Sequence, residues 1–230
     1  MTLLLLISTV ACGPQSRIPS RDAVVPGMIA GDAPEARLVR ELAPVLYLQR
    51  DETFQLTRVV AIVDAERRRI AYHLLWRDDV HGAWLPFTKP TDEEIVWVGY
   101  DSAGAPTDIW TFWHGTTLHA DWKGKGAVAI DVQWGKHGSL PRGTVRGDLP
   151  WLQTLDLFWL ATYVGLPDLW LGKIGREGPW CFCHGRARYW EFTRPIPTAP
   201  LIDAIVGPED ARAALRAVFG ENYSMKRLWP

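Results

Sequence analysis

The sequence predicts a mainly β protein, folded as an antiparallel two-sheet sandwich or jelly roll with a few peripheral helices. Segments rich in apolar, β-branched and aromatic residues recur about every 10–18 residues over much of the chain, with no helical pattern between them. Hydrophobic residues make up 47% of the chain and charged residues 22%, which excludes a disordered chain. The 13 tryptophans are large, flat side chains of the kind found in sandwich cores and on sugar- or membrane-facing surfaces.

A short helix is expected first, over residues 33–42. Asp32 can cap it, Pro34 suits its first turn, and Glu35 lies near the positive end of the helix dipole. The sequence pattern then changes to a period of two, with a hairpin loop at residues 64–68. The strands that we expect cover residues 45–48, 58–63, 69–76, 94–100, 108–114, 117–122, 127–134 and 188–193.

Two later segments have helical patterns. Residues 151–164 carry apolar residues at spacings of three and four, which predicts a helix packed over one sheet or, alternatively, a helix that dips its tryptophans into a bilayer. Residues 208–219 predict another helix, with Pro208 in the first turn and Gly220 at the end. No internal repeat or low-complexity tract occurs, so residues 32–230 are expected to form a single domain.

The N-terminus resembles a bacterial lipoprotein signal. Residues 3–10 form an apolar run with the length of a signal-peptide core, too short to span a bilayer, and Ala11 and Cys12 follow it. The resemblance implies that residues 1–11 are removed and that Cys12 carries the lipid. Residues 12–31, rich in Pro, Gly and Ser, would then form a tether. We therefore expect a protein that is lipid-anchored at the bacterial cell envelope or secreted.

Cys181 and Cys183 are the other two cysteines. A single residue separates them, so in an extended strand their side chains share a face, with Cα atoms about 6–7 Å apart. This spacing leaves three alternatives open, namely a strained disulfide, part of a soft-metal site, and two buried thiols.

The densest polar segment joins two of the expected strands. It contains Asp78, Asp79 and His81, and it continues to Asp92 and Glu94. The last two lie two residues apart, so an extended backbone places both carboxylates on one face. Convergent carboxylates repel each other unless a cation or a proton lies between them, and oxygen-rich clusters suit Ca²⁺ or Mg²⁺. The alternative interpretation is a solvated acidic loop.

A second polar segment, Gly-Lys-His-Gly at residues 135–138, predicts a tight turn at the end of a strand. Sandwich proteins often display functional loops at such ends. His137 in this turn is either a surface residue or a ligand-binding residue. Further ligand contacts that we expect are His81, His114 and Trp113, although the last two could equally pack in the core.

The motif Asp92-Glu93-Glu94-Ile95-Val96-Trp97-Val98, followed by the turn at 135–138, is similar to a pattern in the Vps62-related and necrosis-inducing (NPP1-like) β-sandwich proteins. In these groups an Asp-Trp-Glu motif runs into a Val-rich strand, and a later strand ends in a His-Gly turn. In the necrosis-inducing family these acids, an earlier Asp and a His bind a divalent cation, and the protein docks on membrane glycolipid head groups. The resemblance covers residues 44–142. The site residues that it implies are Asp79, Asp92, Glu94 and His137.

These observations predict a binding module rather than an enzyme, with a divalent-cation (Ca²⁺ or Mg²⁺) or polar-ligand site at one end of the sandwich. The expected partners are a membrane, through the lipid anchor, and a small polar or carbohydrate-like ligand. A net charge of −1 excludes a strongly basic nucleic-acid binder. One alternative is a glycoside or ester hydrolase in which Asp92 or Glu94 acts as general base near His137. The other is a structural envelope protein without a ligand site.

Overall fold

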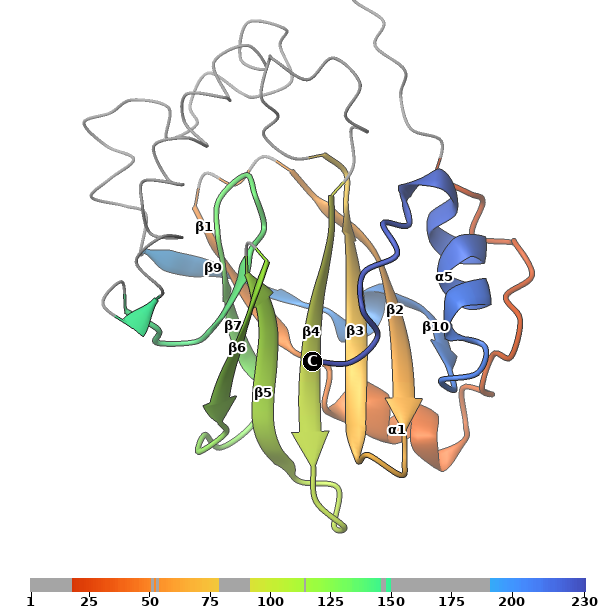
Figure 1. Ribbon diagram of the computed structural model, residues 1–230, viewed down its shortest axis with the longest axis horizontal. Coiled ribbons are helices and arrows are strands. Elements are labelled where there is room, and N and C mark those ends of the chain that lie inside the picture. Colours follow the sequence, from red (N-terminus) through yellow and green to blue (C-terminus); the bar gives the residue numbers. More distant parts are fainter. Residues whose placement is uncertain are drawn as a thin grey trace, which may run out of the picture.

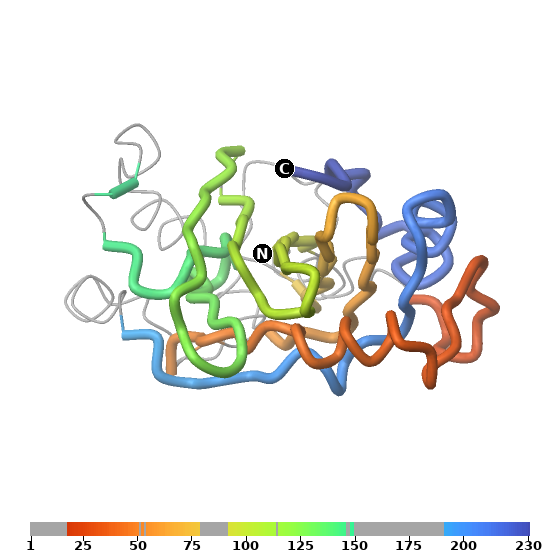
Figure 2. Tube along the Cα trace, turned by 90° about the horizontal axis from the view of Figure 1, so that it is seen from below, coloured from red at the N-terminus to blue at the C-terminus, as the bar shows by residue number. Residues whose placement is uncertain are grey.

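The computed structural model describes residues 18–50, 52, 54–78, 92–113, 115–145, 148–149 and 191–230. These residues form two β-sheets that pack face to face, together with two α-helices at the periphery (Figure 1). The tube drawn from below shows the four-stranded layer lying along one side of the six-stranded layer (Figure 2). The predicted two-sheet β-sandwich is therefore confirmed.

The bounds of the elements are as follows. The larger sheet consists of β2 (Leu56–Asp64), β3 (Arg69–Trp76), β4 (Asp92–Tyr100), β5 (Pro106–Trp113), β6 (Thr116–Asp121) and β10 (Ile202–Val206). The smaller sheet consists of β1 (Val45–Gln49), β7 (Ala129–Val132), β8 (Ser139–Pro141) and β9 (Phe192–Pro197). The helices are α1 (Pro34–Glu41) and α5 (Ala211–Phe219), with short 3₁₀ turns η2 (Ala199–Leu201) and η3 (Gly220–Asn222).

Apolar side chains cover both faces of the larger sheet. On its inner face, residues such as Val59, Tyr72 and Val96 meet Leu46 of β1 and Ile130 of β7 in the main core. On its outer face, a second cluster joins β2, β3, β4 and β10 to helix α5. Because both faces are covered, β2, β3 and β4 are buried at nearly every position and form continuous apolar runs.

The sheets are mixed, not wholly antiparallel as predicted. Their strand orders are β10-β2-β3-β4-β5-β6 and β8-β7-β1-β9. The meander from β2 to β6 is antiparallel, but β1 pairs in parallel with β7, and β10 pairs in parallel with β2. Hairpin spacing identifies strands that are neighbours along the chain, whereas these parallel pairs join strands remote in sequence. Strand β10 was missed for this reason, whereas β8, which pairs antiparallel with its chain neighbour β7, is only three residues long.

The last strand of the smaller sheet also differs from the prediction. A strand was predicted over residues 188–193, whereas β9 covers Phe192–Pro197 and includes Pro195 and Pro197. Strand β9 pairs with β1 alone and forms an edge of its sheet. A proline, which has no backbone N–H to donate, is tolerated on such an edge.

Helix α1 confirms the helix predicted over residues 33–42, and α5 confirms the later one with a shorter range. Residues 208–210 form a turn, so α5 begins at Ala211, and Gly220 with a φ of +62° ends it. The helix predicted over 151–164 lies outside the described residues. Within the described ranges, no helix combines the length and the hydropathy that a membrane crossing requires.

Part of the segment predicted as a tether, residues 12–31, contacts the domain. Ile18 and Val25 pack against the outer cluster of the larger sheet. Met28 forms a β-bridge with Val206, and the Ile29 N–H donates to the carbonyl of Ile205 at 2.8 Å. Residues 18–29 therefore pack against the larger sheet and belong to the domain.

Candidate functional site

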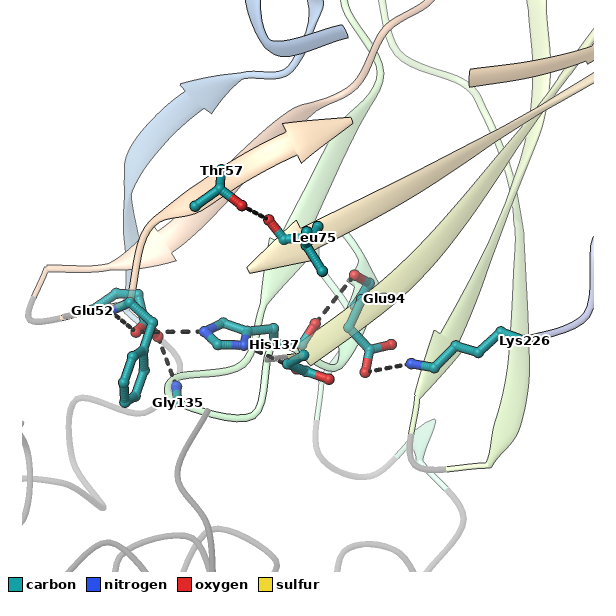
Figure 3. Close-up of polar contacts among 10 residues, drawn as sticks. Glu52, Thr57, Leu75, Glu94, Gly135, His137 and Lys226 are labelled. Atoms are coloured by element: carbon teal, nitrogen blue, oxygen red, sulfur yellow. Dashed lines mark hydrogen bonds and ion pairs between the residues drawn. The ribbon is translucent and has the colours of Figure 1, made fainter. Parts of the chain in front are cut away.

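The candidate site lies at the end of the sandwich where β4 begins (Figure 3). Asp92 is the first residue of β4 and pairs with Trp76, the last residue of β3. His137 lies in the turn between β7 and β8, and Glu52 lies in the loop after β1. Remote segments of both sheets thus bring acidic and basic side chains together at one end.

The turn that carries His137 has a constrained backbone. His137 has a φ of +51°, in the left-handed region that few residues other than glycine adopt, and Gly135 has a φ of +66°. The His137 N–H donates to the carbonyl of Gln133 at 3.0 Å, and the Gln133 N–H donates to the carbonyl of Gly138 at 3.0 Å. These two bonds close the turn and aim the imidazole into the sandwich.

The imidazole of His137 is fully buried between aromatic rings and carboxylates. It stacks on the Trp76 indole, with ring centroids 4.0 Å apart and planes within 6°, and the edge of Phe54 approaches it at 5.9 Å. Its Nδ1 lies 3.0 Å from Asp92 Oδ2, and its Nε2 lies 3.6 Å from Glu52 Oε1. Each ring nitrogen therefore faces a carboxylate.

The two carboxylates keep His137 protonated. Burial alone would lower the pKa of the imidazole, but Glu52 and Asp92 outweigh burial and raise the pKa from 6.5 to about 9. At neutral pH the ring is an imidazolium, which donates from both nitrogens and has no lone pair to offer a metal ion. In this state His137 is a fixed positive charge.

Backbone donors hold Glu52 in place. Its Oε2 accepts a hydrogen bond from the Gly135 N–H at 2.7 Å, and its Oε1 accepts one from the Phe54 N–H at 2.9 Å (Figure 3). The first bond ties the loop after β1 to the turn of His137. Glu52 was not predicted as a site residue, because nothing in the sequence near it indicates its distant partner.

Glu94 pairs with a second internal cation, Lys226 of the C-terminal segment. The Lys226 Nζ lies 2.9 Å from Glu94 Oε1 (Figure 3). Burial raises the pKa of Glu94 to about 8, with Asp92 adding to the rise and Lys226 opposing it. Burial would lower the pKa of Lys226, but Glu94 and Asp92 outweigh it and the pKa is raised.

Among the described residues that the ion pairs of this cluster join, the charges do not balance when every group is ionised. Three carboxylates (Glu52, Asp92 and Glu94) face two cations (His137 and Lys226). His137 is inaccessible to solvent, whereas the Asp92 side chain is 17% exposed and that of Lys226 is 21% exposed. The site therefore has a closed base and a partly exposed rim, where the Asp92 side chain is more exposed than that of Glu94, which is 11% exposed.

Glu93 points to the opposite face of β4 and forms a separate polar group there. Its Oε1 lies 2.7 Å from His73 Nδ1, and its Oε2 accepts hydrogen bonds from the N–H and the hydroxyl of Ser224 at 2.6 and 2.7 Å. Burial opposes ionisation of Glu93, but the bonds from His73 and Ser224 outweigh burial and lower the pKa. This group fastens the C-terminal segment to the sheet.

The structure brings some of the predicted site residues together and places others elsewhere. Asp92 and His137 are in direct contact, and Glu94 extends the same cluster to Lys226. Trp113 is fully buried and packs with Leu140, Leu149 and Phe192, so it lies in the core and not at the solvent-exposed rim. Among the described residues, no group of three His, Cys, Asp or Glu side chains is arranged to hold a metal ion. The predicted residues that lie outside the described part are Cys12, Asp79, His81, His114, Cys181 and Cys183.

Comparison with known proteins gives structural matches only. No family model matches the chain, and no curated protein sequence does so. NLPPya in complex with mannosamine is similar in structure, with 11% sequence identity and a TM-score of 0.37 over 56% of this chain and 77% of that one. NLPPya in complex with glucosamine gives 12% identity and a TM-score of 0.36 over 54% of this chain and 74% of that one. NLPPya is a necrosis- and ethylene-inducing peptide 1-like protein.

Proposed function

We propose that the protein is a binding module of the bacterial cell envelope and not an enzyme. In this proposal the rim formed by Asp92 and Glu94 binds a ligand that carries positive charge or hydrogen-bond donors. The ligand is a divalent cation such as Ca²⁺ or Mg²⁺, or a small polar, carbohydrate-like molecule. Both classes share the chemistry that an acidic site recognises.

The observation that carries this proposal is that, among the described residues paired in this partly buried cluster, three carboxylates face two cations. A buried negative charge without a partner is costly, so such a charge takes up a proton or attracts an external cation or donor. In the absence of a ligand, the raised pKa of Glu94 shows that a proton can neutralise the excess near neutral pH. A bound ligand would supply the same compensation at the exposed rim.

The position of His137 favours a binding role over hydrolysis. A general base must be free to accept a proton, whereas Asp92 is paired with the His137 imidazolium and Glu94 is paired with Lys226. The ring is also closed off by Trp76 and Phe54. Its role in the proposal is to fix the orientation of Asp92 and so to preorganise the rim.

Titration calorimetry tests the proposal, with Ca²⁺, Mg²⁺, Mn²⁺ and glucosamine as separate probes. Glucosamine supplies an ammonium and several hydroxyl donors on one small ring. We expect at least one probe to bind, and we expect Asp92→Asn and Glu94→Gln each to weaken that binding at least tenfold. Asp32→Asn removes an exposed acid just before helix α1 and serves as the matched control. The absence of binding heat for all four probes would overturn the proposed site.

A screen with chromogenic glycosides and esters tests the non-enzymatic part of the proposal. We expect no turnover. Turnover that disappears in Glu94→Gln and persists in Asp32→Asn would favour the hydrolase instead.

The envelope location is tested separately, through Cys12. Expression of the full chain in a bacterial host, followed by membrane fractionation, should place the protein in the membrane fraction. The variant Cys12→Ser should lose this association, because a lipid anchor needs the thiol. A wild-type protein that stays soluble in the host cytoplasm would overturn the anchoring.

A further inference from the structure

The C-terminal segment, residues 223–229, crosses the outer face of the larger sheet and is called the strap below. Ser224 binds Glu93 through its N–H and its hydroxyl, and Lys226 binds Glu94. Further along, the Trp97 Nε1–H donates to the carbonyl of Leu228 at 2.6 Å. In Figure 1 this segment runs back over the strands from the end of α5. The strap is thus fastened to β4 at three points.

Adjacent acids of β4 bind alternate residues of the strap. Between Ser224 and Lys226 lies Met225, which has a φ of +56° and is 61% exposed. A left-handed conformation at an exposed, unbranched residue has no packing reason of its own and is unfavourable by about 1 kcal/mol or more. It allows Ser224 and Lys226 to reach Glu93 and Glu94 together.

We propose that Lys226 is the resident cation of the candidate site and that an external cation competes with it for Glu94 and displaces it on binding. This inference rests on the proposed function of the Asp92–Glu94 rim. The Lys226 ammonium lies 2.9 Å from Glu94 Oε1, whereas the buried Oε2 has no hydrogen-bond partner among the described residues. Two cations at one carboxylate repel each other, so Lys226 and an external cation compete for Glu94.

Displacement of Lys226 couples ligand binding to the strap. Without its ion pair, the left-handed backbone at Met225 loses one of the two contacts that offset its strain. Residues 225–227 should then move away from β4, while Ser224 and Leu228 keep their own bonds to the sheet. Binding of an external cation should therefore loosen the strap locally.

Two matched variants of the full chain test this inference. Lys226→Met removes the ammonium but keeps an apolar stem that can pack near Phe112, over whose ring Lys226 lies. Arg227→Met removes the same charge from the next residue, which also lies over Phe112, and controls for general electrostatics. Affinities for Ca²⁺ and glucosamine are measured by calorimetry. Hydrogen exchange of the strap is followed in the wild type with and without each probe.

We expect Lys226→Met to bind Ca²⁺ or glucosamine about tenfold more tightly than the wild type, or to bind where the wild type does not. Arg227→Met should change the affinity by less than threefold. The probe should also speed exchange in residues 225–227 of the wild type.

Three other outcomes would overturn the inference. Binding of equal strength in wild type and Lys226→Met, with unchanged exchange in the strap, would overturn the role of Lys226 and leave the proposed site intact. Equally tighter binding by Lys226→Met and Arg227→Met would mean that net charge alone sets the affinity. This result would also overturn the role of Lys226. No binding in any of the three proteins would overturn the site and the displacement together.

Discussion

Replacing His137 with asparagine should remove a pH-dependent part of the free energy of unfolding. In the folded protein, Glu52 and Asp92 outweigh burial and raise the pKa of His137 from 6.5 to about 9. Because the folded pKa is the higher one, this stabilisation is fully present below about pH 6.5 and is lost as the pH rises through about 9. A difference of about 2.5 pKa units corresponds to about 3 kcal/mol, at about 1.36 kcal/mol per unit.

Asparagine is the suitable replacement, because it carries no charge and tolerates the left-handed backbone better than most residues do. Urea unfolding of the wild type and His137→Asn between pH 6 and pH 10 measures the effect. The advantage of the wild type should shrink by about 3 kcal/mol over this range. The exposed His119, replaced in the same way, is the control for the loss of an imidazole at a solvent-exposed position. Parallel stability curves for wild type and His137→Asn would refute the reasoning.

Two further predictions concern packing and buried charge. In Gly138→Ala the new Cβ would lie 2.6 Å from Trp113 Cδ1, so the turn or the buried indole must move, and we expect a loss of about 1–3 kcal/mol in urea unfolding. Gly31→Ala meets no atom within 4 Å and should be near neutral, and equal effects of the two would contradict the packing of the turn. Arg58→Met should destabilise by about 3–5 kcal/mol, because it removes a buried partner of Asp203 and the donor to the Val218 carbonyl. Arg21→Met breaks an exposed pair with the same Asp203 and should change the stability by less than about 1 kcal/mol, so a similar loss in both would be inconsistent with this difference in burial.

The part of the fold that the sequence predicts well is the part governed by local pattern. The meander from β2 to β6 has hairpin loops and apolar segments that are adjacent along the chain, and α1 has a proline and an acid in its first turn. The parallel partners of β1 and β2 could not be predicted in this way. Their pairing depends on β7 and β10, which lie about 80 and 145 residues further along the chain.

The candidate site likewise consists of residues that the local sequence pattern predicts and residues that it does not. The two-residue spacing of Asp92 and Glu94 and the turn of His137 are visible in the sequence, and the structure brings all three to one end. Glu52 and Lys226 had no comparable signal. Each is a single charged residue in a segment without a motif, and its role comes only from a partner remote in sequence.

The buried base of the site also holds three segments of the fold together. Substitutions there therefore change stability as well as function. Glu52, Asp92 and His137 connect the loop after β1, the start of β4 and the turn before β8, so their removal leaves buried charges unpaired and weakens both sheets. At the rim, Lys226 is more exposed than Asp92 or Glu94, so a variant at Lys226 alters the ligand contact with less effect on the fold. A ligand at this rim would also stabilise the folded chain, by about 2.7 kcal/mol at one hundred times its dissociation constant. The melting temperature of a rim variant, measured with and without the probe, therefore separates lost binding from lost folding.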